Sequence, residues 1–286
     1  MNITRKFSSW AVALFLAFPS QVFGLDTASL FAPAFPGDGQ TANWRIIDKS
    51  AATHQPWTAV GNFLIPGLGG YCSAVLVAPR IVLTANHCLY ALDYSKPDAR
   101  GNPTQQLMDP TQFVFVAGVH DESFIDAIPV EAVITGGWAP GSEETAKDWV
   151  IAILARPASA SIVPMAFKSY KPEAAVAAWS NKLVVAAYPA ASFAFSSVLR
   201  FSFNCSILKS AANVVRHDCA SQGGSSGGPI LVEENGAMRL VGIHSSSQGA
   251  ASGSKNGVSI NSFLVPLEAA VARFETTLPV NVAVLR

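Results

Sequence analysis

A serine on a glycine-rich segment is a candidate nucleophile in this chain. Ser226 lies in Gly-Ser-Ser-Gly-Gly-Pro at residues 224–229, directly before the apolar run 230–232. A serine hydroxyl becomes a useful nucleophile only when a base takes its proton and backbone amides face the developing oxyanion. Clustered glycines permit the tight turn that this arrangement needs. Because a Gly/Ser-rich hairpin loop has the same composition, the segment alone does not establish a catalytic serine.

A histidine far upstream adds a base, and its surroundings resemble a known family. His87 lies in Val-Leu-Thr-Ala-Asn-His-Cys at residues 82–88, which is similar to the Leu-Thr-Ala-Ala-His-Cys motif of the trypsin/chymotrypsin family of serine proteases. Residues 72–77, Cys-Ser-Ala-Val-Leu-Val, resemble the family strand whose cysteine bonds to the one after the histidine. A lone histidine beside a cysteine is more often a packed core residue, but here the strand, the cysteines and the later serine follow the family's order.

Under this resemblance, Asp148 is the third member of a Ser-His-Asp triad. Residues 147–154, Lys-Asp-Trp-Val-Ile-Ala-Ile-Leu, are similar to the family segment Asp-Ile-Ala-Leu-Leu, in which the aspartate orients the histidine. A carboxylate there holds the imidazole in the required tautomer and stabilises the imidazolium. Asp121 and Asp126 are the competing candidates, but neither precedes a continuous apolar strand in this way.

The resemblance implies acyl transfer that requires no metal and no cofactor. His87 would take the Ser226 proton, the backbone amides of Gly224 and Ser226 would hold the oxyanion, and a water would release the acyl-enzyme. Two residues depart from the family pattern, because Asn86 replaces the usual alanine before the histidine and Ser225 replaces the aspartate before the nucleophile. In trypsin-like zymogens that aspartate pairs with the freshly cut N-terminus, so activation by that ion pair is not expected here.

The predicted pocket resembles that of the bacterial glutamyl endopeptidase branch, which also lacks that aspartate. Residues 242–245, Gly-Ile-His-Ser, are similar to the family's pocket strand Gly-Ile-Val-Ser, whose serine, here Ser245, also bonds the catalytic aspartate. Trypsin-like enzymes that cleave after Arg or Lys place an aspartate six residues before the nucleophile, where this chain has Ala220. Cleavage after a basic residue is therefore not expected.

Glutamyl endopeptidases line this pocket with a hydroxyl residue five before the nucleophile, a histidine before the pocket-strand serine and a hydroxyl residue three after that histidine. The matching residues here are Ser221, His244 and Ser247. An imidazole and two hydroxyls can all donate hydrogen bonds to a carboxylate, so the resemblance implies a preference for cleavage after Glu. The alternative is that His244 is a packed strand residue and the pocket takes small apolar side chains, as in elastase-like enzymes.

Short β-strands must position these residues, because brief apolar runs recur between Gly, Pro and Asn along the chain. Many short strands separated by turns favour a sandwich or barrel over a parallel α/β sheet. The resemblance narrows this all-β prediction to two six-stranded antiparallel β-barrels, at about residues 45–154 and 161–262, followed by a C-terminal helix at about 263–277. We also expect a long surface loop at residues 90–112 and, at residues 155–160, the segment in which the chain passes from the first half to the second.

The N-terminus predicts export. Two basic residues precede an apolar run at residues 10–18 and small residues follow it, which is the pattern of a secretory signal peptide over residues 1–24. A buried helix or a membrane anchor is the alternative, but the run is too short to span a bilayer comfortably. Residues 25–44 are expected to be a propeptide or linker, so a peptidase domain would span 45–286 and be secreted or periplasmic.

In an oxidising compartment the four cysteines predict two disulfides. Three connectivities are open to Cys72, Cys88, Cys205 and Cys219. We expect the two local pairs, Cys72–Cys88, as the resemblance implies, and Cys205–Cys219. Each would close a loop of roughly 15 residues and add around 3 kcal/mol of stability. The sequence has no C-x-x-C motif with a matching histidine, so a zinc site is not expected.

Composition argues against several other functions. Lys plus Arg equals Asp plus Glu at 19 each, so no basic surface for nucleic acid is expected. We expect polypeptide substrates, no membrane contact after signal cleavage, and a monomer.

Residues 224–228 also satisfy the G-x-S-x-G motif of α/β-hydrolases, but that fold needs a helix after the serine, and Pro229 and a β run follow here. The other alternative is a catalytically inactive relative that acts as a binding protein, although all three triad residues are present.

Overall fold

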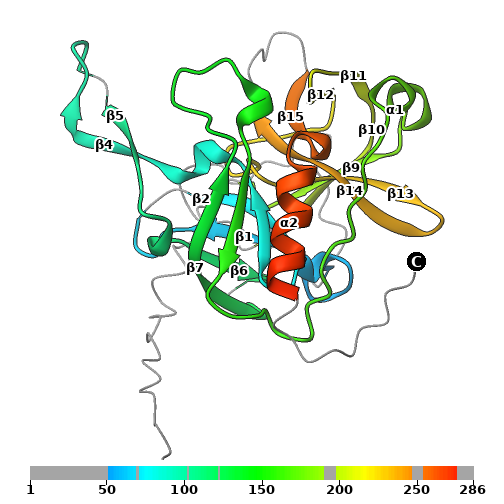
Figure 1. The fold of residues 1–286 in the computed structure, drawn as a ribbon, viewed down its shortest axis with the longest axis horizontal. Coiled ribbons are helices and arrows are strands. Elements are labelled where there is room, and N and C mark those ends of the chain that lie inside the picture. Colours follow the sequence, from blue (N-terminus) through cyan, green and yellow to red (C-terminus); the bar gives the residue numbers. More distant parts are fainter. Residues whose placement is uncertain are drawn as a thin grey trace, which may run out of the picture.

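Six strands in the first half of the chain close into an antiparallel barrel (Figure 1). The structure is a computed structural model, and it describes residues 51–68, 71–101, 103–121, 123–189, 198–246 and 254–275. Around the barrel the order is β1-β2-β3-β8-β7-β6. The strands are β1 (Val60–Leu64), β2 (Tyr71–Ala78), β3 (Ile81–Thr84), β6 (Val114–Ala117), β7 (Asp126–Thr135) and β8 (Val150–Leu154).

Four of these strands are buried along their whole length, which explains their continuous apolar runs. Every residue of β1, β3, β6 and β8 is buried. One face of such a strand packs inside the barrel and the other packs against the rest of the protein, so neither face needs polar residues. The two strands next to His87 and Asp148, β3 and β8, are therefore held firmly on both sides.

The second half forms one sheet in the order β10-β9-β13-β14-β15-β12-β11. All of its neighbouring strands are antiparallel. The strands are β9 (Leu183–Ala187), β10 (Arg200–Cys205), β11 (Ile207–Ala211), β12 (Val214–His217), β13 (Pro229–Glu234), β14 (Ala237–Ser246) and β15 (Lys255–Ser259).

This seven-stranded sheet differs from the closed six-stranded barrel that the sequence predicted for the second half. Its two outer strands, β10 and β11, follow each other in the chain and are separated by Ser206 alone. Asn204 has a φ of 56°, and the Ser206 backbone N–H donates to Asp218 Oδ1 over 2.7 Å instead of joining a strand ladder. One long strand is thus bent into two, and counting it once restores the expected six.

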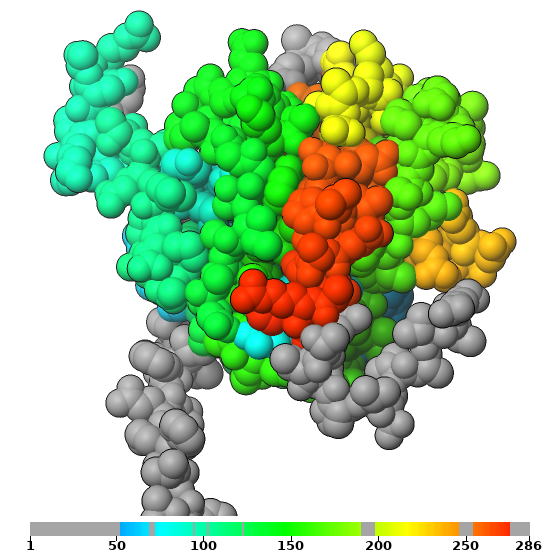
Figure 2. Space-filling view, viewed as in Figure 1, coloured from blue at the N-terminus to red at the C-terminus, as the bar shows by residue number. Residues whose placement is uncertain are grey.

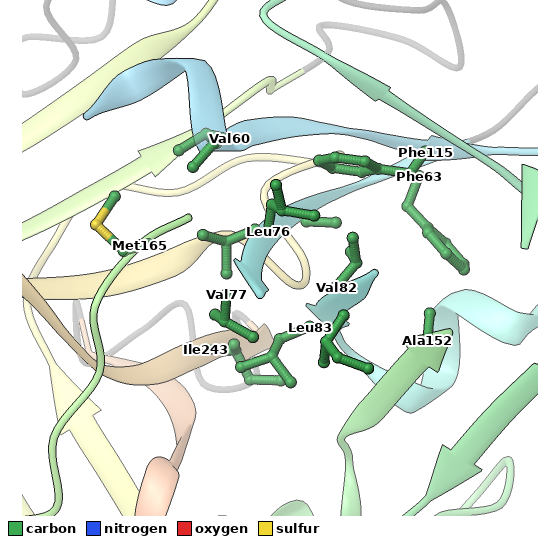
Figure 3. Packing of buried hydrophobic residues seen from close by; sticks show 14 of the residues in the cluster. Val60, Phe63, Leu76, Val77, Val82, Leu83, Phe115, Ala152, Met165 and Ile243 are labelled. Atoms are coloured by element: carbon green, nitrogen blue, oxygen red, sulfur yellow. The ribbon is translucent and has the colours of Figure 1, made fainter. Parts of the chain in front are cut away.

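A shared hydrophobic core fixes the two halves to each other. Ile243 of β14 belongs to the same buried cluster as Val77 of β2 and Leu83 of β3 (Figure 3). Full burial of one such side chain contributes about 1.5–3 kcal/mol. Groups contributed by the two halves can therefore meet in a site of fixed geometry.

The terminal helix α2 (Leu264–Glu275) matches the predicted helix, of which residues 276–277 lie outside the described part. It lies at the surface beside both halves (Figure 2). Just before it, the Phe263 ring packs 5.5 Å from the Trp149 ring, and Ser262 Oγ donates to the Ala146 carbonyl over 2.6 Å. These contacts brace the segment that holds Asp148.

A second helix, α1 (Pro172–Ala178), was not predicted, although its proline at the first position and its alanines favour a helix. Neither α-helix is long and apolar enough to cross a bilayer. The short 3-10 segments are η2 (Ala51–Thr53), η3 (Trp57–Ala59), η4 (Asn86–Leu89), η5 (Pro110–Gln112), η6 (Thr145–Lys147) and η8 (Ile260–Ser262). The predicted signal peptide and linker, residues 1–44, lie outside the described residues.

The prediction of a long surface loop at 90–112 was wrong. β4 (Tyr90–Pro97) pairs with β5 (Pro103–Leu107) in a two-stranded hairpin. It stands out from the body at the left of Figure 2. Of the three prolines that indicated a loop, Pro97 and Pro103 lie at the ends of the strands nearest the hairpin tip, where a missing N–H costs no ladder bond, and Pro110 begins η5.

Candidate active site

The strand pairing of the first barrel brings His87 next to Asp148. His87 lies on η4, just after β3, and Asp148 lies just before β8. Because Thr84 of β3 pairs with Val150 of β8, the two side chains start from neighbouring strand ends. His87 Nδ1 lies 2.8 Å from Asp148 Oδ2, and the His87 backbone N–H donates to Asp148 Oδ1 over 2.8 Å. Both carboxylate oxygens therefore orient the histidine.

Asp148 is 2% exposed, yet its environment favours the charged form. Burial acts to raise the pKa of Asp148, but hydrogen bonds from His87 and Ser245 and the charge of His87 outweigh burial and hold the pKa below its ordinary value. Ser245 Oγ donates to Oδ2 of the same carboxylate. An ionised Asp148 keeps a proton on Nδ1 of the neutral imidazole, which leaves Nε2 of His87 free to accept one.

Ser226 lies on a turn that only glycine permits at the next position. Gly227 has a φ of +78°, and a Cβ there would lie 2.1 Å from Thr84 Oγ1 and 2.3 Å from the Ser73 carbonyl oxygen. The Gly227 N–H donates to the His244 carbonyl over 2.7 Å, and the Ser226 carbonyl accepts from the Ser73 N–H over 2.8 Å. The glycines of this segment therefore let the nucleophile loop pack closely against the first barrel.

The hydroxyl of Ser226, the predicted nucleophile, is hydrogen-bonded to a backbone carbonyl. Its Oγ donates to the Ser245 carbonyl over 3.2 Å. No hydrogen bond joins Ser226 Oγ to His87 within the part of the chain that the structure describes. A change of the serine rotamer is a low-energy motion, and hydrogen bonds between catalytic groups often tighten only when substrate binds.

Two backbone amides at the serine are available for an oxyanion. The N–H groups of Gly224 and Ser226 have no hydrogen-bond partner among the described residues. The peptide groups around them are held, because the Ser225 N–H donates to the Gln222 carbonyl over 3.1 Å and the Gly228 N–H donates to the Ser225 carbonyl over 3.0 Å. This arrangement leaves both free donors on the segment that carries the nucleophile.

Ser225, which replaces the family's aspartate, is fully buried in this loop. Its Oγ accepts from the Gln222 N–H over 3.1 Å. The side chain therefore closes a local turn and carries no charge that could pair with an N-terminus.

His244 is buried against a second histidine that the sequence did not indicate. His217 of β12 is 0% exposed and His244 of β14 is 1% exposed, and His217 Nε2 lies 3.2 Å from His244 Nδ1. Their strands each pair with β15. Burial and the charge of Lys255 lower the pKa of His217 to about 3. Burial, followed by the charges of neighbouring groups, of which His217 contributes most, lowers the pKa of His244 well below its ordinary value.

The hydrogen bonds around these two neutral rings assign their protons. The Cys219 backbone N–H donates to His217 Nδ1 over 3.2 Å, so the His217 proton is on Nε2. That Nε2–H donates to His244 Nδ1, which places the His244 proton on its own Nε2. The pair thus presents a fixed N–H donor on His244.

The other predicted pocket residues are only partly placed. Ser221 is half-buried two residues after Cys219, and Ser245 bonds Asp148. Ser247 lies outside the described residues. His217 had one sequence signal, its position two residues before a predicted disulfide cysteine, but that spacing does not indicate a second pocket histidine.

An aromatic side chain that the sequence analysis missed lies against the base. The Trp138 ring meets the His87 ring edge-on at 5.9 Å and the Tyr90 ring at 5.8 Å. Tyr90 OH donates to the Trp138 carbonyl over 3.3 Å. Trp138 comes from a Gly- and Pro-rich loop after β7, so nothing in its local sequence marked it.

Both predicted local disulfides are present and lie at the site. Cys72–Cys88 joins β2 to the turn that carries His87, and Cys205–Cys219 joins the end of β10 to the segment that leads into the nucleophile loop. Cys72, His87 and Cys88 also form the group of potential metal ligands found in the described residues. Because both cysteines are in the disulfide, this group offers no metal site.

Comparisons with known proteins agree with this geometry. The sequence matches the Trypsin family over residues 46–266. No curated protein matches the sequence significantly. Among solved structures, that of a Glu endopeptidase in complex with MPD is similar with a TM-score of 0.57 and 12% identity, covering 85% of this chain and 99% of the other. At this identity the likeness shows the fold, and it confirms the chymotrypsin-like architecture.

Proposed function

Because this chain belongs to the trypsin family of serine proteases, we propose that it is an active endopeptidase with Ser226 as nucleophile, His87 as base and Asp148 as orienting carboxylate. The observation that carries this proposal is the pair of hydrogen bonds from His87 to buried Asp148, one from Nδ1 and one from the backbone N–H. It orients the imidazole beside the serine loop, which a binding protein would not need.

In the proposed mechanism, the Ser226 hydroxyl leaves the Ser245 carbonyl, gives its proton to His87 Nε2 and attacks the peptide carbonyl. The tetrahedral oxyanion accepts from the free N–H groups of Gly224 and Ser226. His87 then protonates the leaving amine, and a water deacylates Ser226 by the same route. Apart from the water that hydrolyses the acyl-enzyme, every catalytic group in these steps comes from this chain.

A fluorophosphonate probe tests whether the serine is activated. The probe should label the protein, and Ser226→Ala should abolish labelling. Ser161→Ala, which removes an exposed serine outside the triad motifs, is the matched control and should label normally. An unlabelled parent protein would favour the inactive relative.

We further propose that the enzyme prefers to cleave after Glu. The neutral His244 carries its proton on Nε2 because His217 donates to its Nδ1. Such a donor forms a charge-assisted hydrogen bond with a carboxylate, which is stronger than a neutral one. Ser221 would add a hydroxyl donor. A bound carboxylate would also favour the imidazolium form of His244.

Peptides that differ only in the residue before the cleaved bond test this preference. Glu should be cleaved faster than Gln, Ala, Leu or Arg, and His244→Val should reduce cleavage after Glu far more than after Ala. His120→Val, which changes a partly exposed histidine of the first half, is the control. Cleavage after Ala that equals or exceeds cleavage after Glu would instead support the small apolar pocket.

We also propose that the protein is secreted or periplasmic, on the basis of the N-terminal pattern and the two disulfides. Mass spectrometry of the N-terminus of exported protein tests this. A start at or after residue 25 would support signal cleavage, and a retained Met1 would contradict it.

A further inference from the structure

Ser73 is a fully buried hydroxyl at the contact between the two halves, and the proposed mechanism does not use it. It lies on β2 directly after Cys72, whose disulfide partner is next to His87. A buried hydroxyl normally has a partner because an unpaired one is costly. Two of the partners of Ser73 lie on the nucleophile loop.

Four hydrogen bonds connect Ser73 to its surroundings. Its Oγ donates to the Gly224 carbonyl over 2.8 Å and accepts from the Tyr188 N–H over 2.9 Å. Its N–H donates to the Ser226 carbonyl over 2.8 Å. Its carbonyl accepts from Thr84 Oγ1 over 2.9 Å. The residue therefore joins the first barrel to two peptide groups of the nucleophile loop.

The bond from Oγ acts on the peptide group that lies between the two free amides. The carbonyl of the peptide linking Gly224 to Ser225 accepts from Ser73, and its N–H donates to Gln222. Because a peptide group is planar, holding both ends fixes its orientation. The free N–H groups of Gly224 and Ser226 lie on the peptide groups either side of it, so their directions depend on it.

Gly224 makes this support necessary. Its φ is +85°, in the region that glycine enters freely. A glycine flanked by rotatable bonds can turn the adjacent peptide at little cost unless a partner holds the carbonyl. Within the described residues, the Ser73 hydroxyl is the side chain that holds it.

We propose that Ser73 is a positioning residue that holds the oxyanion loop in its productive conformation from the opposite half of the protein. This inference rests on the proposed protease function. Ser73 touches no reacting atom, so its effect should fall on the transition state and not on substrate binding. Removing one oxyanion donor costs about 10²–10³ in kcat in a known protease. Loosening two donors should therefore lower kcat at least ~10-fold, with KM changed less than ~3-fold.

The test compares Ser73→Ala with Ser73→Thr in the full chain. Kinetics on one peptide substrate give kcat and KM, and a peptide aldehyde of the same sequence, which forms a tetrahedral adduct with Ser226, reports oxyanion stabilisation directly. We expect Ser73→Ala to lose aldehyde affinity in proportion to kcat/KM. Ser73→Thr retains the hydroxyl and should recover part of both.

Ser259→Ala is the matched control, because Ser259 is 1% exposed and its Oγ accepts from the Asn261 N–H, which is outside the nucleophile loop. It should lose stability without losing kcat per folded molecule. Thermal unfolding of each variant supplies the folded fraction. If Ser73→Ala does not fold, Ser73→Gly, which also lacks the hydroxyl, replaces it.

A folded hydroxyl-free variant with parental kcat and aldehyde affinity would overturn the role of Ser73. So would a loss confined to KM. These results leave the protease function intact, because the parent protein is then active. An inactive parent that also fails to bind the aldehyde would instead overturn the proposed function, and the positioning role with it.

Discussion

The two halves of this protein hold their functional groups by different means. In the first barrel, His87 and Asp148 leave adjacent ends of paired, fully buried strands, so the sheet register sets their separation. In the second half, Ser226 and its oxyanion amides lie on a glycine-rich loop between strands. That loop is held by individual hydrogen bonds, several of which come from the first barrel. His87, the proposed base, is thus held by regular structure, and Ser226, the proposed nucleophile, by single contacts.

This difference predicts where substitutions act. Changes around His87 and Asp148 in the first half that keep the barrel folded should affect the rate of chemistry with any substrate. Changes around His217 and His244 in the second half should affect substrate choice and stability. The predictions below test that division, beginning with the largest expected effect.

Removing either the nucleophile or the base should abolish catalysis. Ser226→Ala and His87→Ala should each lower kcat by on the order of 10⁶, and the double variant should be no worse because the residues act as a unit. Active-site labelling and peptide hydrolysis measure the loss. A Ser226→Ala protein that retains more than a few per cent of activity would refute the assignment.

Asp148→Asn should keep the geometry of the site but shift the neutral His87 ring from the Nδ1–H tautomer to the Nε2–H tautomer. An amide can donate to His87 Nδ1, which favours the wrong tautomer and should lower kcat by roughly 10⁴. Ser245→Ala removes only one hydrogen bond to the carboxylate and should have a much smaller effect. A near-normal rate for Asp148→Asn would direct attention to Asp121 or Asp126.

Removing each disulfide tests whether the two halves have the different roles described above. Replacing either cysteine pair by alanines should cost around 3 kcal/mol by the chain-entropy estimate, measured by denaturant unfolding. Loss of Cys72–Cys88 should mainly lower kcat, because it releases the His87 turn. Loss of Cys205–Cys219 should mainly change the ratio of cleavage after Glu to cleavage after Ala. The reverse pattern would contradict the division, and peptide mapping without reduction verifies the pairings.

The buried histidines should make the protein sensitive to mild acid. The pKa of His217 is about 3 in the folded state, whereas an unfolded histidine titrates near 6.5. Between these values the unfolded chain binds more protons, so stability is complete above pH 6.5 and falls as the pH decreases. One such group contributes a slope of about 1.4 kcal/mol per pH unit well below its unfolded pKa.

His217→Gln should reduce that slope, as measured by unfolding between pH 7 and 4.5. His54→Gln, which replaces an exposed histidine, is the control and should show the same slope as the parent protein. An unchanged slope in His217→Gln would mean that another group causes the acid sensitivity. Asp148, whose folded pKa is also lowered, contributes only at lower pH, where its own stabilising effect is lost.

Much of this molecule could be predicted from the sequence because its motifs are local. The triad residues each lie within a short segment of recognisable composition, and buried strands appear as continuous apolar runs. Both disulfides were predicted as sequence-local pairs, and Cys72–Cys88 was also implied by the resemblance. The hairpin at β4 and β5 was missed because its prolines indicated a loop, and only strand pairing shows that they lie at strand ends.

The sequence by itself determined which residues have the chemistry of a serine protease and that they lie on a β framework. Only the tertiary structure decided which polar groups support them. His217 and His244 are 27 residues apart, and Ser73 and Gly224 are 151 apart. Contacts over such separations depend on how the sheets pack against each other, because spacing along a strand says which face a side chain occupies but not which distant group that face will meet.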